Sequence, residues 1–285
     1  MNIVLRGGKL EDAGACGAIC YQAFASIADQ HNFPPDIPSA EMATGFLSYF
    51  LTNDSIYSVI AEVDGKIAGS NFLHESKFIG GVGPITVDPH IQNSSVGKKL
   101  MLNVLERAEE QQLAGVRLVQ SAYHNRSLSL YAKLGFDAQE PLSVMQGPAP
   151  GITFPDYGVR LANETDLEAC NQLCAQVHGH DRGQELLGAV KTGTATVVEH
   201  NGKITGYATQ VGFMGHSVAE TNNEMKALIG ASASFAGPGF LLPTRNAELL
   251  RWCLVNGLRI AQPMTLMSKG LYNQPAGAFL PSILY

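Results

Sequence analysis

Residues 87–101 read VDPHIQNSSVGKKLM, and this stretch decides the fold. The run before it, GPITV at 83–87, is short, apolar and partly β-branched, which predicts a buried strand that Pro89 ends. Residues 92–97 are small or polar and predict a loop that leads straight into an amphipathic helix. Because a helix N-terminus carries unpaired N–H groups and the positive end of the dipole, the stretch predicts an anion site.

The charges on this helix also indicate an anion site. Lys98 and Lys99 fall in its first turn, where acidic residues are preferred, and Glu109 and Glu110 fall near its other end. Each such placement costs roughly 0.3–1 kcal/mol at an exposed site. A polyanion bound beside the lysines would reverse the sign of that cost.

Composition narrows the class of protein. The chain has 285 residues, of which 45% are hydrophobic and 15% charged, so we expect a globular protein of one or two domains. Its apolar content leaves room for an interdomain or oligomer contact, a homodimer included. A net charge of −6 without a block of lysine or arginine argues against nucleic-acid binding. The sequence has neither a signal-peptide core nor ~20 consecutive apolar residues, which predicts no membrane insertion.

Cysteine and histidine spacing predicts no metal. Four of the five cysteines form two pairs, each four residues apart in a helical pattern, as expected of small buried side chains: Cys16 with Cys20, and Cys170 with Cys174, with Cys253 left over. Neither pair has the spacing of a zinc site, and His178 and His180 have no third ligand placed by the pattern. An odd number of cysteines without a secretory signal predicts a reduced, cytoplasmic protein.

Local patterns predict a mixed α/β order. We expect strands at 3–6, 58–63, 66–72, 83–87 and 116–122, and helices at 11–24, 42–51, 96–112 and 126–134. Asp64-Gly65 joins the second and third strands as a type I′ turn, and Gly135 ends the last helix. Asn125 is a suitable N-cap for that helix.

The pattern then begins again. Aligning Arg160 with Arg6 places Asp166 on Asp12, and EHNGKITG at 199–206 repeats EVDGKIAG at 62–69. We therefore predict a first domain at 1–146, a linker at 147–155 and a second, degenerate domain at 156–285. At the point taken as matching the anion loop, residues 239–248 run from strand to helix at an Asn246 cap without a glycine loop. The second domain is therefore expected to have a structural or substrate-shaping role.

Two motifs resemble one family. Gln92, Ser95 and Gly97 occupy the places of the loop that holds the coenzyme pyrophosphate in the GNAT superfamily of acetyl-CoA-dependent N-acetyltransferases. The family usually has Gly where this chain has Ser95, and a positive φ there would disfavour serine. NRSLSLYAKLGF at 125–136 is similar to the GNAT segment in which an Asn starts a helix and a Tyr faces the coenzyme sulfur. The resemblance covers 1–146 well and 156–270 weakly.

The resemblance implies an α/β fold of two tandem GNAT-like domains, each a central mixed β-sheet flanked by helices. It implies acetyl-CoA as cosubstrate and an amine, of a small molecule or peptide, as acceptor. The coenzyme would contact Ile85, Thr86, Val87, Gln92, Asn93, Ser94, Ser95, Val96, Gly97, Lys98, Asn125, Ser127 and Tyr131. Backbone N–H groups of 85–87 would polarise the thioester carbonyl.

By the same resemblance, Tyr131 is the general acid that protonates the departing thiolate. A phenol with a pKa near ~10 is protonated at pH 7. The base is less defined, because residues 78–83 contain no carboxylate. Glu75 is our candidate, with His74 and His124 as alternatives. In the second half, residues 178–182 with His216, Glu220 and Glu224 are dense in polar groups and would line the acceptor pocket if the two halves face each other.

Three functions stay open from sequence. The first is an N-acetyltransferase in which the amine attacks acetyl-CoA directly in a ternary complex. The second is a non-catalytic acyl-CoA sensor or binding module, which Ser95 and the missing carboxylate favour. The third is an inert tandem scaffold.

Overall fold

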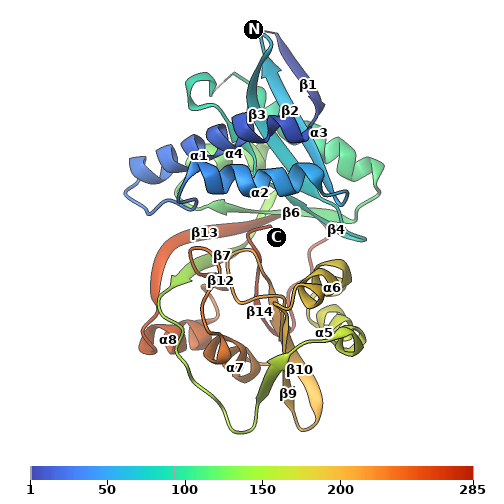
Figure 1. Cartoon of the computed structure of the whole chain (residues 1–285), viewed down its shortest axis with the longest axis vertical. Helices are drawn as coiled ribbons and strands as arrows, with labels where there is room; N and C mark the ends of the chain where they lie inside the picture. Colours follow the sequence, from blue (N-terminus) through green and yellow to red (C-terminus); the bar gives the residue numbers. More distant parts are fainter. Residues whose placement is uncertain (1, 93, 285) are drawn as a thin grey trace. The chain divides into compact units, whose positions relative to one another are not determined.

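The computed structural model describes residues 2–92 and 94–284 (Figure 1). It has a mixed α/β fold, as predicted, and divides into two compact units. Unit 1 comprises the chain as far as Ala138, together with Met267–Leu271 and Leu284. Unit 2 comprises Gln139–Leu266 and Tyr272–Ile283. Within the described residues, no helix has the length and apolar character needed to cross a membrane.

Unit 1 is a mixed sheet with helices on both faces. Its strands are β1 (Ile3–Gly7), β2 (Ile56–Val63), β3 (Lys66–His74), β4 (Ile79–Val82), β5 (Thr86–Val87) and β6 (Gly115–Ser121). Its helices are α1 (Ala13–Gln30), α2 (Ala40–Thr52), α3 (Val96–Glu110) and α4 (Asn125–Lys133), with short 3₁₀ turns η1 (Leu10–Asp12) and η2 (Pro89–Ile91). The strands β1 to β4 pair antiparallel in sequence order, and β6 pairs with β4 in parallel.

Alternation along the strands gives each face of this sheet its own core. Ile60 and Phe72 pack with buried residues of α1 and α2, which lie side by side in Figure 1. Val59 and Leu73, one position away on the same strands, pack with α3 on the other face. The apolar stripe predicted for α3 is confirmed, because Val96, Leu100, Val104 and Ala108 are all buried.

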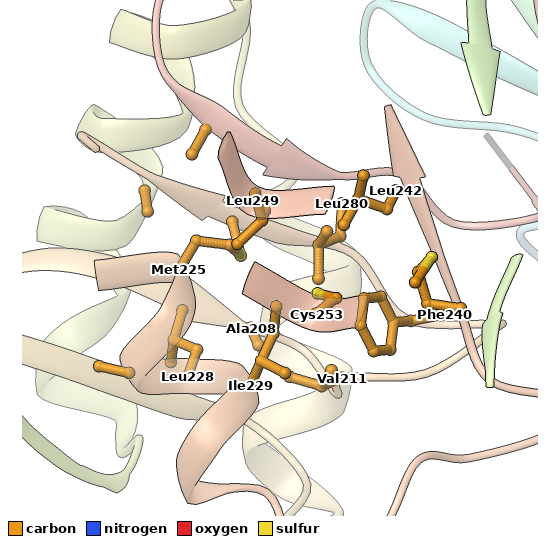
Figure 2. Packing of buried hydrophobic residues seen from close by; sticks show 14 of the residues in the cluster. Ala208, Val211, Met225, Leu228, Ile229, Phe240, Leu242, Leu249, Cys253 and Leu280 are labelled. Atoms are coloured by element: carbon orange, nitrogen blue, oxygen red, sulfur yellow. The ribbon is translucent and has the colours of Figure 1, made fainter. Parts of the chain in front are cut away.

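Unit 2 repeats these elements. Its strands are β8 (Gly158–Leu161), β9 (Thr196–His200), β10 (Lys203–Ala208), β11 (Ser217–Ala219), β12 (Phe240–Pro243) and β14 (Ala278–Leu280). Its helices are α5 (Leu167–His178), α6 (Gly183–Lys191), α7 (Asn222–Ala231) and α8 (Ala247–Val255), with the 3₁₀ turn η3 (Glu164–Asp166). One sheet runs β14-β11-β10-β9-β8. Figure 2 shows its core, in which Met225 and Leu228 of α7 lie among residues such as Phe240 and Leu249.

The predicted repeat is visible in side-chain detail. The Arg6 guanidinium donates to both carboxylate oxygens of Asp12, each at 2.8 Å, and to Glu62 at 2.7 Å. Arg160 binds Asp166 at 2.7 and 2.9 Å and Glu199 at 2.6 Å in the same way.

The two hairpin turns also match. Asp64 and Gly65 have φ of 50° and 78°, as a type I′ turn requires, and Asn201 and Gly202 have φ of 52° and 73°. The cysteines of both predicted pairs are buried, as expected. The two units therefore share local architecture as well as element order.

The last strands of the two units do not follow the predicted division. Strand β7 (Asp137–Gln146) starts in unit 1, but its residues from Gln139 onward belong to unit 2, where it pairs with β12. Strand β13 (Arg259–Gly270) starts in unit 2, and its residues from Met267 onward belong to unit 1, where Leu271 N donates to Ala114 O at 2.9 Å. The compact units therefore differ from the division at 146, which stays a prediction about domains.

The counterpart of the anion-loop helix was misplaced from sequence. Residues 239–248 form β12 and the start of α8, which come after α7 and so correspond in order to β6 and α4. The register Gly206↔Ala219 and Tyr207↔Val218 in unit 2 matches Gly69↔Val87 and Ser70↔Thr86 in unit 1. Strand β11 therefore stands in place of β5, and α7 in place of α3. The Asn246 cap itself is confirmed, since its side chain accepts from Leu249 N at 3.3 Å.

Candidate active site

The central strand of unit 1 divides in the middle of the sheet. Strand β4 pairs with β6 from Ile79 to Gly81, and β5 pairs with β3 but with no second strand in the described part of the chain. The strand predicted at 83–87 is therefore shorter, because Gly83 takes a φ of 132° and Pro84 has no N–H to donate. One edge of β5 is left open to a ligand.

Backbone groups at this open edge are available for hydrogen bonding. Asp88 N donates to Ala68 O on β3 at 2.9 Å, so by alternation the N–H of Val87 points to the opposite edge. The Val87 carbonyl accepts from Gln92 Nε2 at 3.3 Å. An extended ligand with its own amides can pair here as an added strand.

The helix that follows begins without a cap. Ser95 is the N-cap of α3, its side chain makes no capping hydrogen bond, and the first turn contains no acidic residue. Lys98 and Lys99 are both exposed at this end. Free N–H groups, the positive end of the dipole and two ammonium groups together make a site for a polyanion.

Ser95 adopts the left-handed backbone conformation that disfavours serine. Its φ is 69° and its ψ is 0°, in the left-handed region that glycine favours. A left-handed conformation costs a non-glycine residue roughly 1–2 kcal/mol. The loop therefore takes the glycine-like shape with serine in place, and it stores strain at that residue.

Side chains on two neighbouring elements hold the loop. Ser94 Oγ donates to Ile91 O at 2.5 Å, and Arg126 of α4 donates to Gln92 Oε1. Arg126 also brings a third positive charge to this end of α3. Sequence reasoning missed it, although it directly follows Asn125 in the second motif. Asn93 lies outside the described residues.

Tyr131 lies inside unit 1 rather than at its surface. It is 6% exposed and packs in the α3-side core near Phe136, with ring centroids 6.1 Å apart. Burial raises the pKa of its phenol to about 12, although a hydrogen bond with Ser127 opposes the shift. The phenol is therefore protonated over the whole physiological range.

The start of α4 differs by one residue from the prediction. His124 is the N-cap and Asn125 the first helical residue, so the Asn125 side chain does not cap the helix. The His124 ring instead shares a hydrogen bond between its Nδ1 and Ser127 Oγ at 2.7 Å. Gly135 has a φ of 89° after the helix, as predicted for its end.

The candidate bases have different surroundings. The Glu75 carboxylate is ion-paired with Arg107 of α3, at 2.6 Å from Nε. His74, on the opposite face of β3, lies against the Phe50 ring at 4.8 Å, with its Nε2 3.1 Å from Gly83 O. The ion pair holds the Glu75 carboxylate against α3. Its role stays a prediction.

Unit 2 fills the positions that unit 1 leaves open. Strand β14 pairs with the outer edge of β11, joining Ser217, Val218 and Ala219 to Leu280, Phe279 and Ala278. The helix α7 is capped by its own side chains, since Thr221 N donates to Glu224 Oε2 at 3.1 Å and Asn223 N donates to Thr221 Oγ1 at 3.1 Å. An anion would meet the Glu224 carboxylate at this helix end.

The polar residues predicted for the second half separate into two places. His216 is buried, with its Nε2 3.0 Å from the Tyr207 hydroxyl and its Nδ1 3.2 Å from Glu185, which is also ion-paired with Arg182. Glu224 belongs instead to the α7 cap. Across residues 2–92 and 94–284, no three His, Cys, Asp or Glu side chains gather in a way that could hold a metal ion.

Comparison with known proteins identifies the family of this site. Residues 23–136 match the model of the Acetyltransferase (GNAT) family. The chain therefore contains a GNAT acetyltransferase domain. The match begins within α1, includes the divided strand, the loop and Tyr131 described above, and ends at Phe136. Members of this family transfer acyl groups from acetyl-CoA.

Solved structures share the fold along nearly the whole chain. A candidate acetyltransferase from Pyrococcus horikoshii is 15% identical with a TM-score of 0.74, and the match covers 99% of this chain and 92% of that one. A GCN5-related N-acetyltransferase from Sphaerobacter thermophilus is 14% identical with a TM-score of 0.62, covering 95% of this chain and 96% of that one. At these sequence identities the likeness shows a shared fold and nothing more specific.

Proposed function

We propose that this GNAT protein is an N-acetyltransferase that moves the acetyl group of acetyl-CoA to an amine by direct attack in a ternary complex. The observation that carries the proposal is the open edge of β5, which leads to the uncapped, lysine-bearing N-terminus of α3. Unit 2 has the same elements with the edge paired and the helix capped. The contrast supports one coenzyme site per chain, in unit 1.

The groups present fit the coenzyme. The N–H groups at the start of α3, with Lys98 and Arg126, would hold the pyrophosphate, and the loop 92–97, including Asn93, would wrap it. The edge residues Ile85, Thr86 and Val87 would pair with the pantetheine amides, and Asn125 would lie at its far end.

The chemistry asks for a proton donor beside the departing sulfur. In this proposal Tyr131 donates that proton, and its buried phenol is kept protonated by the raised pKa. A Val87 N–H at the open edge would polarise the thioester carbonyl. The acceptor is an amine of a small molecule or peptide.

The test begins with binding. Calorimetry should detect acetyl-CoA with one site per chain, and thiol release should rise with some amine of a broad library. Tyr131→Phe should then lower kcat roughly 10²-fold or more with acetyl-CoA affinity nearly unchanged. Absence of acetyl-CoA binding would reject the proposal, and full activity of the Phe variant would reject the acid role alone.

A non-catalytic acyl-CoA sensor is the second candidate. The ion pair of Glu75 with Arg107 favours it, because it occupies the carboxylate that sequence reasoning offered as base. A sensor would bind acetyl-CoA and release no thiol with any amine.

A further inference from the structure

The N-cap of α4 and two side chains on the helix form a line that the proposed acid step uses only at one end. His124, Ser127 and Tyr131 follow one another at spacings of three and four residues, which places them on one face of the helix. His124 Nδ1 lies 2.7 Å from Ser127 Oγ, and the Ser127 hydroxyl faces the Tyr131 phenol closely enough to lower its pKa. A proton can therefore pass between the phenol and the imidazole through one hydroxyl.

The second ring nitrogen of His124, Nε2, lies at the other end of the line. His124 Nε2 is buried, and it has no hydrogen-bond partner in the part of the chain that the structure describes. Buried polar atoms are normally paired, so an unpaired ring nitrogen next to a candidate active site marks a place for a substrate group.

The surroundings keep this imidazole neutral. Burial lowers the pKa of His124 to about 4, and the neighbouring Arg126 and His31 act in the same direction. His31 and Phe33, from the turn after α1, pack on the ring of Tyr123, which directly precedes His124, at 5.2 and 4.3 Å. A neutral imidazole has a lone pair that can accept a proton.

We propose that His124 is the catalytic base and that Ser127 relays a proton from it to Tyr131. The proposal rests on the proposed function and deepens it. His124 begins with its proton on Nδ1. As the amine nitrogen forms its bond to the acetyl carbon, the amine proton passes to His124 Nε2.

The remaining transfers return the same number of protons. The Nδ1 proton moves to Ser127 Oγ, the Ser127 proton moves to the Tyr131 oxygen, and the Tyr131 proton moves to the departing sulfur as its bond to the acetyl carbon breaks. The products are an amide and a free thiol, and no residue is left charged. His124 ends with its proton on Nε2, and it returns to the first tautomer through water after the products leave.

The relay explains how a phenol with a high pKa can act as an acid. Tyr131 alone would be left as a buried phenolate, which burial strongly disfavours. Because Ser127 transfers a proton to the Tyr131 oxygen as Tyr131 gives up its own proton, no buried phenolate forms. The same transfer explains why His124 does not need to become a buried cation.

Four variants test the relay in an active wild-type enzyme. Ser127→Ala and His124→Ala should each lower kcat roughly 10²-fold, and the double variant should lose no more than either one, since both break the same path. Ser127→Thr keeps the hydroxyl and should keep most of kcat. Ser129→Ala is the matched control, because this hydroxyl on the same helix donates to Asn125 O at 2.8 Å and lies outside the relay.

Binding and tautomer measurements separate the relay from a structural or coenzyme-contact role. Acetyl-CoA affinity should change less than about twofold in Ser127→Ala, whereas a coenzyme contact would weaken it together with kcat. Nitrogen-15 NMR of the coenzyme-bound protein should show His124 neutral with the proton on Nδ1. Multiplicative losses in the double variant, or a proton resident on Nε2, would overturn the relay.

The outcome also distinguishes the two proposals. A wild-type protein that turns over amines while Ser127→Ala remains fully active overturns the relay and leaves the N-acetyltransferase intact. A wild-type protein that binds acetyl-CoA but releases no thiol with any amine overturns both.

Discussion

At the scale of single residues, Ser95 shows most directly how the structure answers a question that the sequence raises about backbone conformation. The family pattern has glycine there, and the structure gives serine the left-handed φ of 69° that glycine would take without strain. The loop geometry is therefore set by its neighbours, among them the hydrogen bonds of Gln92 and Ser94, rather than by the preference of residue 95. The strain is a cost to folding and not an obstacle to the loop shape.

Ser95→Gly should therefore stabilise the protein. Relief of the left-handed strain is worth roughly 1–2 kcal/mol, and the added flexibility of glycine in the unfolded chain takes back roughly 0.5–1 kcal/mol, for a net gain of up to about 1.5 kcal/mol. Urea unfolding measures it. Ser94→Gly is the control and should destabilise, because it removes the hydroxyl bonded to Ile91 O. Destabilisation by Ser95→Gly would show that the serine hydroxyl contributes more than the strain costs.

At the scale of elements, α3 and α7 show one helix position used in two ways. In α7, Thr221 and Glu224 satisfy the first N–H groups internally, while α3 starts with neither a side-chain cap nor an acid and carries Lys98 instead. The difference was readable in sequence, since Thr221-Asn222-Asn223-Glu224 has the spacing of a capping box. The capping box was missed because the sequence alignment of the repeat matched α3 with α8, one strand and one helix beyond α7.

Lys98→Glu should therefore change stability and binding in opposite directions. A carboxylate in the first turn of α3 favours the dipole, so the ligand-free protein should gain about 0.3–1 kcal/mol in free energy of unfolding. Acetyl-CoA affinity should fall roughly tenfold or more, equal to about 1.4 kcal/mol, and the loss should shrink at high salt.

Lys66→Glu makes the same change of charge on the exposed β2–β3 hairpin and is the control for net charge. Calorimetry at two salt concentrations reads out both variants. Equal acetyl-CoA affinity of Lys98→Glu and wild type at low salt would contradict the anion site.

Features set by neighbouring residues were predictable, and features set by distant pairing were not. The Asp64-Gly65 turn and the buried stripe of α3 follow from local chemistry, and both are confirmed. The start of α4 was misplaced by one residue, because local patterns fix the ends of a helix only to within one or two residues. The short β5, the pairing of Glu75 with Arg107 and the partner of the Gln92 side chain depend on contacts distant in sequence, which no local pattern records.

At the scale of the whole molecule, neither copy of the repeat is built from one continuous segment. Unit 1 takes Met267–Leu271 from the C-terminal part of the chain, and unit 2 takes the residues of β7 from Gln139 onward from the N-terminal part. The segments on both sides of the linker predicted at 147–155 contribute residues to both units. Each unit depends on a strand that comes from the other half of the sequence.

Residues 1–146 alone should therefore fail to form a stable unit 1. The shortened chain lacks Met267, which is 1% exposed in the α3-side core, and loss of a buried methionine side chain costs roughly 2–5 kcal/mol. It also lacks Leu271, whose N–H donates to Ala114 O, so the outer edge of β6 would be unpaired and prone to associate with other chains.

Size-exclusion chromatography and thermal unfolding followed by circular dichroism should show aggregation or a broad transition for 1–146 and a cooperative transition for the full chain. Coexpression with residues 147–285 should restore the cooperative transition, because that fragment supplies 267–271. A monomeric 1–146 that unfolds as cooperatively as the full chain would show that the first repeat folds without the borrowed strand.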